Sequence, residues 1–425
     1  MAQPGVGRSM GRIISRHVVD AAGRPGHHRE HDQVEECQQV PEGPGVKVLV
    51  GSWPAYGHLL PMLPMIRAAQ AAGHDVMVSS GSDMAGLLGR LGIRHHVSGV
   101  TLAESYARMP GERAVSEMPP EEQPVFAAKH LFGAGAADRA RDVAELVQTW
   151  RPDLVLHDTL ELGSPTAAIV HGVPHVTHGY GPTVPGSSVF AAGIGSVVAE
   201  AGLPDPAEPV LAAPYLDVCP PGLRGAQPEP WTDMRPLKPS AGEVLDDDPA
   251  VELDGLPHDR TVYVTLGTIM NQAAHVFRDV VEGCTAHDVN LVVTTGPGLD
   301  GSALGTLPGS VRTAPYLPQA ALLPHCTAVV SHAGAGTMLG ALCHGLPQLC
   351  LPQGTDQPFN TDALMPTGAA LALHPDEVTS DAVAEALGRL LGDATFRAAA
   401  ERLRSEIEQM PPAGKVLADL ADTSD

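Results

Sequence analysis

Short apolar strands that alternate with glycine-bearing loops and helical stretches constrain the fold of this chain most. Residues 46–50 form a run rich in valine, the loop 51–57 contains glycine at both ends, and an apolar helical stretch continues to Ala72. Gly73 ends this helix, and Val76–Ser80 is a second strand pattern. A strand, a crossover helix and another strand in this order form a right-handed unit with parallel strands. The sequence therefore predicts a parallel sheet covered by helices.

The same alternation continues along the chain in two series. Further strand patterns lie at Leu154–His157, Val173–Thr177, Thr261–Leu266, Leu291–Thr295, Thr327–Ser331 and Gln348–Leu351. Helical patterns lie at Val276–Cys284, Ala320–Leu323 and Thr337–His344, and two more occupy Ser380–Ile407. A chain of 425 residues exceeds the roughly 100 to 200 residues of a single domain. We therefore expect an α/β protein with two doubly wound parallel-sheet domains.

Changes in composition suggest where these domains begin and end. Residues 1–45 are rich in Gly, Arg, His, Glu and Gln and are expected to be a disordered extension. Residues 46–201 form the first domain in this interpretation, and proline and glycine crowd the linker region 202–257. The second domain spans 258–395, and 396–425 form a C-terminal helix and tail.

Charge and cysteine content exclude several classes of protein. The formal net charge of -23 argues against a nucleic-acid or anionic-membrane partner, because those surfaces attract excess Lys and Arg. The six cysteines form no CxxC motif, and no apolar run reaches the roughly 18 to 20 residues of a membrane span. No signal peptide is recognisable either. We expect a cytoplasmic protein that holds any anionic ligand locally, at helix N-termini and glycine loops.

The strongest local signal is a strand that runs through a glycine loop into a helix, at residues 329–337. The loop reads His332-Ala333-Gly334-Ala335-Gly336-Thr337. Glycines let the backbone approach an anion closely, and the helix N-terminus offers unpaired N–H groups and a partial positive charge. The pattern therefore predicts a diphosphate site, with His332 and Thr337 as added donors. The alternative is a tight turn around a buried histidine.

A dinucleotide-binding protein is a second interpretation of the same residues. Gly334, Gly336 and Gly340 imitate a dinucleotide fingerprint, and Asp356 follows at nearly the spacing of a ribose-binding acid. An NAD(P)-dependent oxidoreductase is therefore the alternative function. Against it, the fingerprint belongs in the first unit of its domain, whereas this loop follows two earlier strands.

Three motifs in fixed order resemble a known family. The segments His332–Thr337, His344-Gly345-Leu346-Pro347 and Gly354-Thr355-Asp356-Gln357 are similar to the donor-binding signature of the UDP-glycosyltransferase superfamily, and actinobacterial glycosyltransferases of natural-product and antibiotic biosynthesis are the subgroup they resemble most. The resemblance extends from residue 46 almost to the end of the chain. It implies the GT-B fold, two Rossmann-like domains facing across a cleft. It also implies a hexosyltransferase that acts as a monomer or homodimer.

By this resemblance, the second domain binds a nucleotide-diphosphate sugar. His332 and the residues after it would bind the phosphates, Asp356 and Gln357 the sugar hydroxyls, and the segment from Tyr316 to Gln319 the base. The implied donor-binding residues are Gly267, Thr268, Tyr316, Leu317, Gln319, His332, Gly334, Ala335, Gly336, Thr337, Asp356 and Gln357. Gly340 departs from the family, where an acid that binds the ribose is common. The choice between UDP and dTDP therefore stays open.

The loop after the first strand resembles the acceptor side of the family. Gly57 and His58 match its motif, in which the histidine is the catalytic base, and Asp158 matches the partner aspartate that orients it. An imidazole suits proton removal near neutral pH, and ligands bind at the C-terminal ends of parallel strands. The alternatives are a structural loop histidine and an aspartate that caps the following helix.

The resemblance implies transfer by direct displacement with inversion at the anomeric carbon. His58 would deprotonate a small hydroxylated acceptor, Asp158 would orient His58, and the loop 332–337 would stabilise the departing diphosphate. We expect neither a cofactor nor a metal ion, since no acid cluster suggests one. A third interpretation is a GT-B accessory protein that has lost catalysis. The acceptor has no diagnostic motif, and a hydrophobic polyketide or phenolic compound is the expectation.

Overall fold

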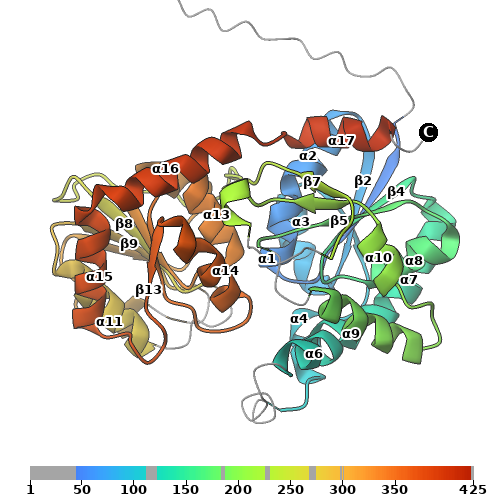
Figure 1. The fold of residues 1–425 in the computed structure, drawn as a ribbon, viewed down its shortest axis with the longest axis horizontal. Coiled ribbons are helices and arrows are strands. Elements are labelled where there is room, and N and C mark those ends of the chain that lie inside the picture. Colours follow the sequence, from blue (N-terminus) through green and yellow to red (C-terminus); the bar gives the residue numbers. More distant parts are fainter. Residues whose placement is uncertain are drawn as a thin grey trace, which may run out of the picture. The chain divides into compact units, whose positions relative to one another are not determined.

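The computed structural model describes residues 45–111, 122–182, 187–224, 230–267, 274–296, 299 and 301–422 (Figure 1). The extension predicted at 1–45 lies outside these ranges except for its last residue. The strands form two parallel sheets, one of seven and one of six strands. The predicted fold class of two doubly wound α/β domains is confirmed. Within the described ranges, no helix has the length and apolar character needed to cross a bilayer.

The first sheet has the strand order β3-β2-β1-β4-β5-β6-β7. Its strands are β1 (Lys47–Gly51), β2 (Asp75–Ser80), β3 (Arg94–Val97), β4 (Leu154–Asp158), β5 (His175–His178), β6 (Tyr215–Asp217) and β7 (Met234–Pro236). All neighbouring strands are parallel. The chain builds outward from β1 in one direction and then in the other, so the order reverses between β1 and β4. Ligands bind at such switch points in open α/β sheets.

Helices cover both faces of this sheet. Val48 and Val50 of β1 pack with α2 (Leu63–Ala71) and α3 (Ala85–Arg90), whereas Leu49 packs on the opposite face with α7 (Ala136–Trp150) and α8 (Gly163–His171). Successive strand residues point to opposite faces, which explains the continuous apolar run in the sequence. The remaining helices of this half are α1 (Tyr56–Leu59), α4 (Leu102–Ala107), α6 (Gln123–Ala127), α9 (Ser187–Glu200) and α10 (Ala207–Ala212).

Part of the stretch predicted as a linker, 202–257, belongs to the first sheet. It contains α10 and the strands β6 and β7. Prolines concealed these strands in the sequence because proline cannot donate to a sheet ladder. In the structure Pro214 precedes β6 and Pro236 ends β7, which is the outer strand of the sheet. The stretch 237–260, between β7 and β8, contains no helix or strand.

The second sheet has the strand order β10-β9-β8-β11-β12-β13. Its strands are β8 (Thr261–Thr265), β9 (Asn290–Thr294), β10 (Val311–Ala314), β11 (Ala328–Ser331), β12 (Gln348–Cys350) and β13 (Ala370–Ala372). All pairs are parallel, and the order reverses between β8 and β11. The second sheet therefore repeats the topology of the first, with its own switch point.

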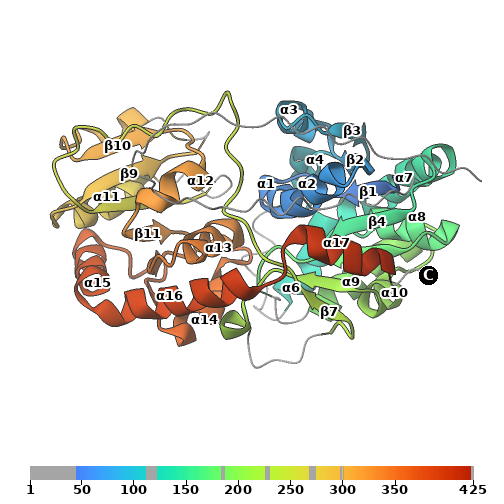
Figure 2. The same cartoon turned by 90° about the horizontal axis from the view of Figure 1, so that it is seen from above.

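Two layers of helices cover the second sheet as well. The helices α11 (Ala274–Thr285) and α15 (Ser380–Gly392) lie side by side on the face of Val262 and Val264 (Figures 1 and 2). On the other face, Tyr263 packs with α12 (Gln319–Leu322) and α13 (Ala335–Cys343). The chain continues through α14 (Gln357–Leu364), α16 (Ala394–Gln409) and α17 (Ala413–Asp422). Side chains of α17 join the core beside α2, so the C-terminal helix completes the first core.

Candidate active site

His58 and Asp158 meet at the switch point of the first sheet. His58 lies in α1, directly after β1, and Asp158 is the last residue of β4. Nδ1 of His58 is 3.1 Å from Oδ1 of Asp158. A carboxylate only accepts hydrogen bonds, so Nδ1 carries the proton of a neutral imidazole and Nε2 keeps its lone pair. No described residue hydrogen bonds to this Nε2.

Asp158 is held as a carboxylate by its surroundings. Its side chain is 1% exposed, and the backbone N–H groups of Trp53 and Leu160 donate to it at 2.6 Å and 2.8 Å. Burial alone would raise its pKa, but the attraction and hydrogen bond of His58 together with these two N–H groups hold the pKa below its ordinary value. Asp158 therefore keeps a negative charge beside His58 at neutral pH.

Aromatic side chains surround the His58 ring. The ring centroids of Trp53 and Tyr180 lie 5.1 Å and 4.8 Å from that of His58, and Phe132 lies at 6.1 Å. Burial raises the pKa of the Tyr180 hydroxyl well above its ordinary value, so this residue stays protonated. The predicted acceptor-loop glycine, Gly57, is exposed, and a Cβ added there would meet no atom within 4 Å. Aromatic side chains therefore cover most of the His58 ring, whose side chain is 12% exposed.

Gly267 and His332 meet at the switch point of the second sheet. Gly267 follows β8 with a φ of 79°, and His332 follows β11. A Cβ at Gly267 would lie 2.6 Å from Nε2 of His332, and a Cβ at Gly334 would also collide with that atom. Both positions therefore require glycine to make room for the imidazole. Burial lowers the pKa of His332, which favours the neutral ring.

The loop after His332 presents the N-terminus of α13. Ala333 has a φ of 61°, the left-handed conformation that costs a residue other than glycine about 1 kcal/mol. Its N–H donates to Oγ of Ser331 at 3.1 Å. Gly334 then caps the helix without any side-chain hydrogen bond, and a Cβ at Gly336 would face open space. The first N–H groups of α13 thus have no side-chain cap, which is the geometry that anions bind at a helix N-terminus. The roles of Gly334, Ala335, Gly336 and Thr337 in donor binding stay predictions.

Asp356 and Gln357 lie at the start of α14, but their side chains do different things. Oδ2 of Asp356 accepts a hydrogen bond from Asn360 at 2.7 Å, and Oδ1 accepts one from Thr355 at 3.0 Å. Gln357 is buried, and its Oε1 accepts the backbone N–H groups of Gln353 and Gly354. Asp356 is partly exposed. The side chain of Gln357 instead binds the backbone of the loop that precedes it.

The predicted base-binding segment lies between β10 and α12. Tyr316 is 52% exposed, whereas Leu317 is buried in the core under the sheet. Nε2 of Gln319 donates to Oγ1 of Thr337 at 2.9 Å, which ties this segment to α13. Thr268 lies outside the described residues.

Gly340 occupies a closed position in α13. A Cβ there would lie 3.2 Å from Leu323 and 3.6 Å from both Ala241 and Oε1 of Gln319. Only the contact with Leu323 is tighter than an ordinary van der Waals contact, so a side chain at position 340 would press on Leu323 and lie beside Oε1 of Gln319.

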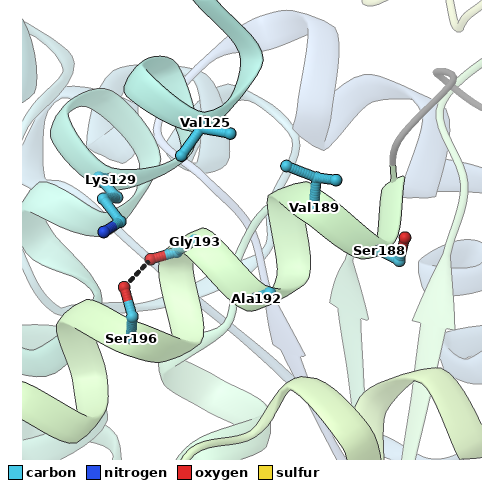
Figure 3. Close-up of a pocket in the computed structure, with 7 residues that line it drawn as sticks. All are labelled: Val125, Lys129, Ser188, Val189, Ala192, Gly193 and Ser196. Carbon is cyan, nitrogen blue, oxygen red and sulfur yellow. Dashed lines mark hydrogen bonds between the residues drawn. The ribbon is translucent and has the colours of Figure 1, made fainter. Parts of the chain in front are cut away.

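An open groove lies on the first domain beside the turn that carries Phe132. Helices α6 and α9 and the π-helical turn Ala128–Phe132 line it (Figure 3). Val125, Val189 and Ala192 form its apolar lining, and Lys129 points toward Gly193 (Figure 3). None of the predicted site residues lines this groove. The described part of the chain holds no cluster of three or more His, Cys, Asp or Glu side chains suited to a metal ion.

Comparisons with known proteins identify the family. Residues 124–267 match the family model described as erythromycin biosynthesis protein CIII-like, N-terminal domain, and residues 278–422 match the C-terminal domain of the same family. The chain is 32% identical to L-demethylnoviosyl transferase of Streptomyces niveus over 387 residues, which are 88% of this chain and 98% of that protein. The chain belongs to the erythromycin biosynthesis protein CIII-like family. It is also 30% identical to the elloramycin glycosyltransferase ElmGT of Streptomyces olivaceus over 395 residues, 88% of this chain and 97% of that protein.

Solved structures agree with this assignment to the erythromycin biosynthesis protein CIII-like family. The glycosyltransferase SnogD of Streptomyces nogalater superimposes with a TM-score of 0.71 at 27% identity, covering 90% of this chain and all of that one. The glycosyltransferase VinC, solved in complex with dTDP, gives a TM-score of 0.71 at 25% identity, covering 88% and 98%. The chain is therefore a GT-B glycosyltransferase of the antibiotic-biosynthesis type. The relatives and the solved structures are glycosyltransferases, so the oxidoreductase alternative is wrong.

Sequence reasoning missed several residues of this region. Trp53 anchors Asp158 through its backbone N–H, which no side-chain pattern reveals. Phe132 and Tyr180 come from segments that the sequence leaves far from His58. Asn360 could have been predicted from the sequence, because it follows Asp356 by four residues and therefore lies on the same face of α14.

Proposed function

We propose that the chain transfers a sugar from a thymidine diphosphate donor to a hydroxyl of a small hydrophobic acceptor, with inversion at the anomeric carbon and His58 as general base. The observation that supports this most is the 3.1 Å contact between Nδ1 of His58 and the buried carboxylate of Asp158. It leaves Nε2 as the proton acceptor, beside the aromatic side chains of Trp53, Phe132 and Tyr180.

The reaction is a single displacement. The acceptor oxygen bonds to the anomeric carbon while its proton passes to Nε2 of His58. The bond from that carbon to the diphosphate oxygen breaks, and the electron pair leaves with the diphosphate. Asp158 stabilises the imidazolium that forms, as the acid does in other His–Asp pairs. Attack opposite the leaving group inverts the anomeric centre.

The second switch point receives the departing charge. Free N–H groups at the start of α13, the helix dipole and the neutral ring of His332 together stabilise a diphosphate. These groups are fixed before the donor binds, so little reorganisation is needed. We therefore propose that transfer needs no metal ion and no cofactor. Asp356, partly exposed at the start of α14, is the proposed ligand for sugar hydroxyls.

The nucleotide choice follows from Gly340 and Tyr316. Deoxyribose has no 2′-hydroxyl, so a donor built on thymidine loses nothing where an acid is missing at position 340. Tyr316 is half-exposed and available to stack on the base. VinC was solved with dTDP, which is the same nucleotide class.

The acceptor class follows from the aromatic side chains around His58. Trp53, Phe132 and Tyr180 favour a flat, apolar molecule with a hydroxyl, such as a polyketide or phenolic compound. We infer that the reaction takes place in the cytoplasm and that the enzyme is a monomer or homodimer.

Nucleotide release from a panel of UDP- and dTDP-sugars with mixed hydroxylated acceptors tests the proposal. We expect release from dTDP-sugars in the parent protein, its loss in His58→Ala, and no loss after EDTA treatment. Release from UDP-sugars alone would reject the nucleotide assignment, and magnesium-dependent recovery after EDTA would reject metal independence. Donor binding without any transfer would favour an inactive accessory protein.

A further inference from the structure

Asn360 connects the two elements that we assign to the donor. It lies in α14, one turn after Asp356, and its side chain is 1% exposed. Nδ2 donates to the carbonyl oxygen of Ala333 at 2.9 Å and to Oδ2 of Asp356 at 2.7 Å. A carbonyl and a carboxylate both accept, so only one orientation of the amide fits between them.

The other half of this amide is unsatisfied. Oδ1 of Asn360 is buried and has no hydrogen-bond partner among the described residues. Burying a carbonyl oxygen without a partner costs desolvation free energy, and an apolar side chain at this position would avoid that cost. The favourable contribution of the Asn360 side chain therefore comes from the two hydrogen bonds that Nδ2 donates.

The bond to Ala333 holds the loop in its bent form. Ala333 has the left-handed φ of 61°, with its N–H fixed by Ser331 and its carbonyl oxygen fixed by Asn360. This bend turns the chain so that Gly334 caps α13 and the first N–H groups of the helix are left free. The bond to Asp356 holds the carboxylate at a fixed place relative to the same loop.

We propose that Asn360 is a positioning residue that joins the diphosphate loop and the sugar-binding carboxylate into one unit ordered before the donor binds. The inference rests on the proposed function, because that function assigns the loop to the diphosphate and Asp356 to the sugar. A site that is ordered in advance loses less conformational entropy on binding, so its affinity is higher. Asn360 itself touches neither part of the donor in this arrangement.

A double-mutant cycle with two ligands tests the inference. Binding of dTDP and of a dTDP-sugar is measured by calorimetry for the parent, Asn360→Ala, Asp356→Ala and the double variant. We expect each single variant to weaken dTDP-sugar binding about tenfold, and the double variant to lose less than the product of the two. We expect Asn360→Ala also to weaken dTDP, through Ala333, by about threefold. Asp356→Ala has no contact with the diphosphate and is expected to spare dTDP.

Thr361→Val is the matched control. Thr361 is the next residue of α14, is also buried, and donates from Oγ1 to the carbonyl oxygen of Gln357 at 2.8 Å. Its loss is expected to lower the melting temperature without changing either affinity. If Asn360→Ala fails to fold, Asn360→Leu replaces it in the cycle, because an apolar side chain of similar size removes both hydrogen bonds without leaving a cavity.

The outcomes separate this inference from the proposed function. Parental affinities in the Asn360 variants, multiplicative losses in the cycle, or equal losses in Thr361→Val would each overturn the positioning role. A parent protein that binds dTDP-sugars without transferring them would overturn the proposed function alone. The same cycle would still measure how Asn360 couples the diphosphate loop to Asp356. A parent protein that binds no nucleotide would overturn both.

Discussion

Nδ1 of His58 lies 3.1 Å from Oδ1 of Asp158, although 100 residues separate the two in the chain. They meet because β1 and β4 are neighbours at the switch point of the first sheet. An exposed pair of this kind would contribute little, since solvent screens it and both side chains lose freedom. Here the carboxylate is buried and fixed by Trp53 and Leu160, so the imidazole is oriented by a rigid partner.

Removing either member of this pair is expected to affect turnover rather than donor binding. His58→Ala removes the proposed base, and we expect kcat to fall about 10²- to 10⁴-fold with donor affinity retained. Asp158→Asn keeps the shape but no longer fixes the tautomer, and we expect a loss on the order of 10⁴-fold in kcat. Steady-state rates with calorimetric donor binding measure both. Parental turnover in His58→Ala would reject the base.

Gly336→Ala is expected to leave a stable protein that binds the donor poorly. A Cβ at this position meets no protein atom within 4 Å, so it fills the space in front of the first N–H groups of α13. Gly86→Ala in α3 is the control, because that helical glycine also faces open space. Each substitution is expected to stabilise its helix by up to about 1 kcal/mol. Only Gly336→Ala should raise the donor KM, by about tenfold or more; equal KM values would contradict the phosphate assignment.

Gly51→Ala is expected to destabilise the first domain. A Cβ there would collide with Oε2 of Glu161 and with the side chain of Ser164. Glu161 is fully buried, 3.6 Å from Nη1 of Arg139, so displacing its carboxylate disturbs an ion pair out of reach of water. We expect a loss of about 2 to 4 kcal/mol in the free energy of unfolding, measured with urea. Gly57→Ala, six residues later in α1 and facing open space, should unfold like the parent.

The stability of the protein is expected to fall as the pH is lowered below about 6.5. Burial lowers the pKa of His157 to about 3 and that of His178 to about 4. A histidine in the unfolded chain takes up its proton near pH 6.5. Between about pH 6 and pH 4 the unfolded state therefore binds protons that the folded state excludes, and each histidine lowers the free energy of unfolding by up to about 1.4 kcal/mol per pH unit.

Urea unfolding between about pH 7 and pH 5 measures this slope. His157→Gln is expected to reduce the slope of the free energy of unfolding against pH by the equivalent of about one bound proton. His171→Gln, at an exposed position of α8, is the control. An unchanged slope in His157→Gln would show that this histidine does not exclude its proton.

Local patterns predicted the strands that carry the site with small errors at their ends. Apolar runs such as 46–50 and 261–266 are long enough to predict strands directly. Strand β1 is shifted by one residue from the first run, and β8 is one residue shorter than the second. Strands β3, β6, β7 and β10 were missed, because they are three or four residues long and polar or flanked by proline, and β13 was missed because it is an alanine-rich strand of three residues. Gln357 was predicted to face the sugar, whereas its amide holds its own loop, a choice that depends on loop geometry alone.

The sequence by itself determined the two-domain parallel architecture and the positions of His58, Asp158 and the loop 332–337. These features depend on residue type and spacing over a few neighbouring positions, so local chemistry specifies them. The tertiary structure alone decided which groups meet: Asp158 with the N–H of Trp53, His332 between Gly267 and Gly334, and Asn360 between Ala333 and Asp356. Such contacts are set by strand order and packing between distant segments, which no local pattern encodes.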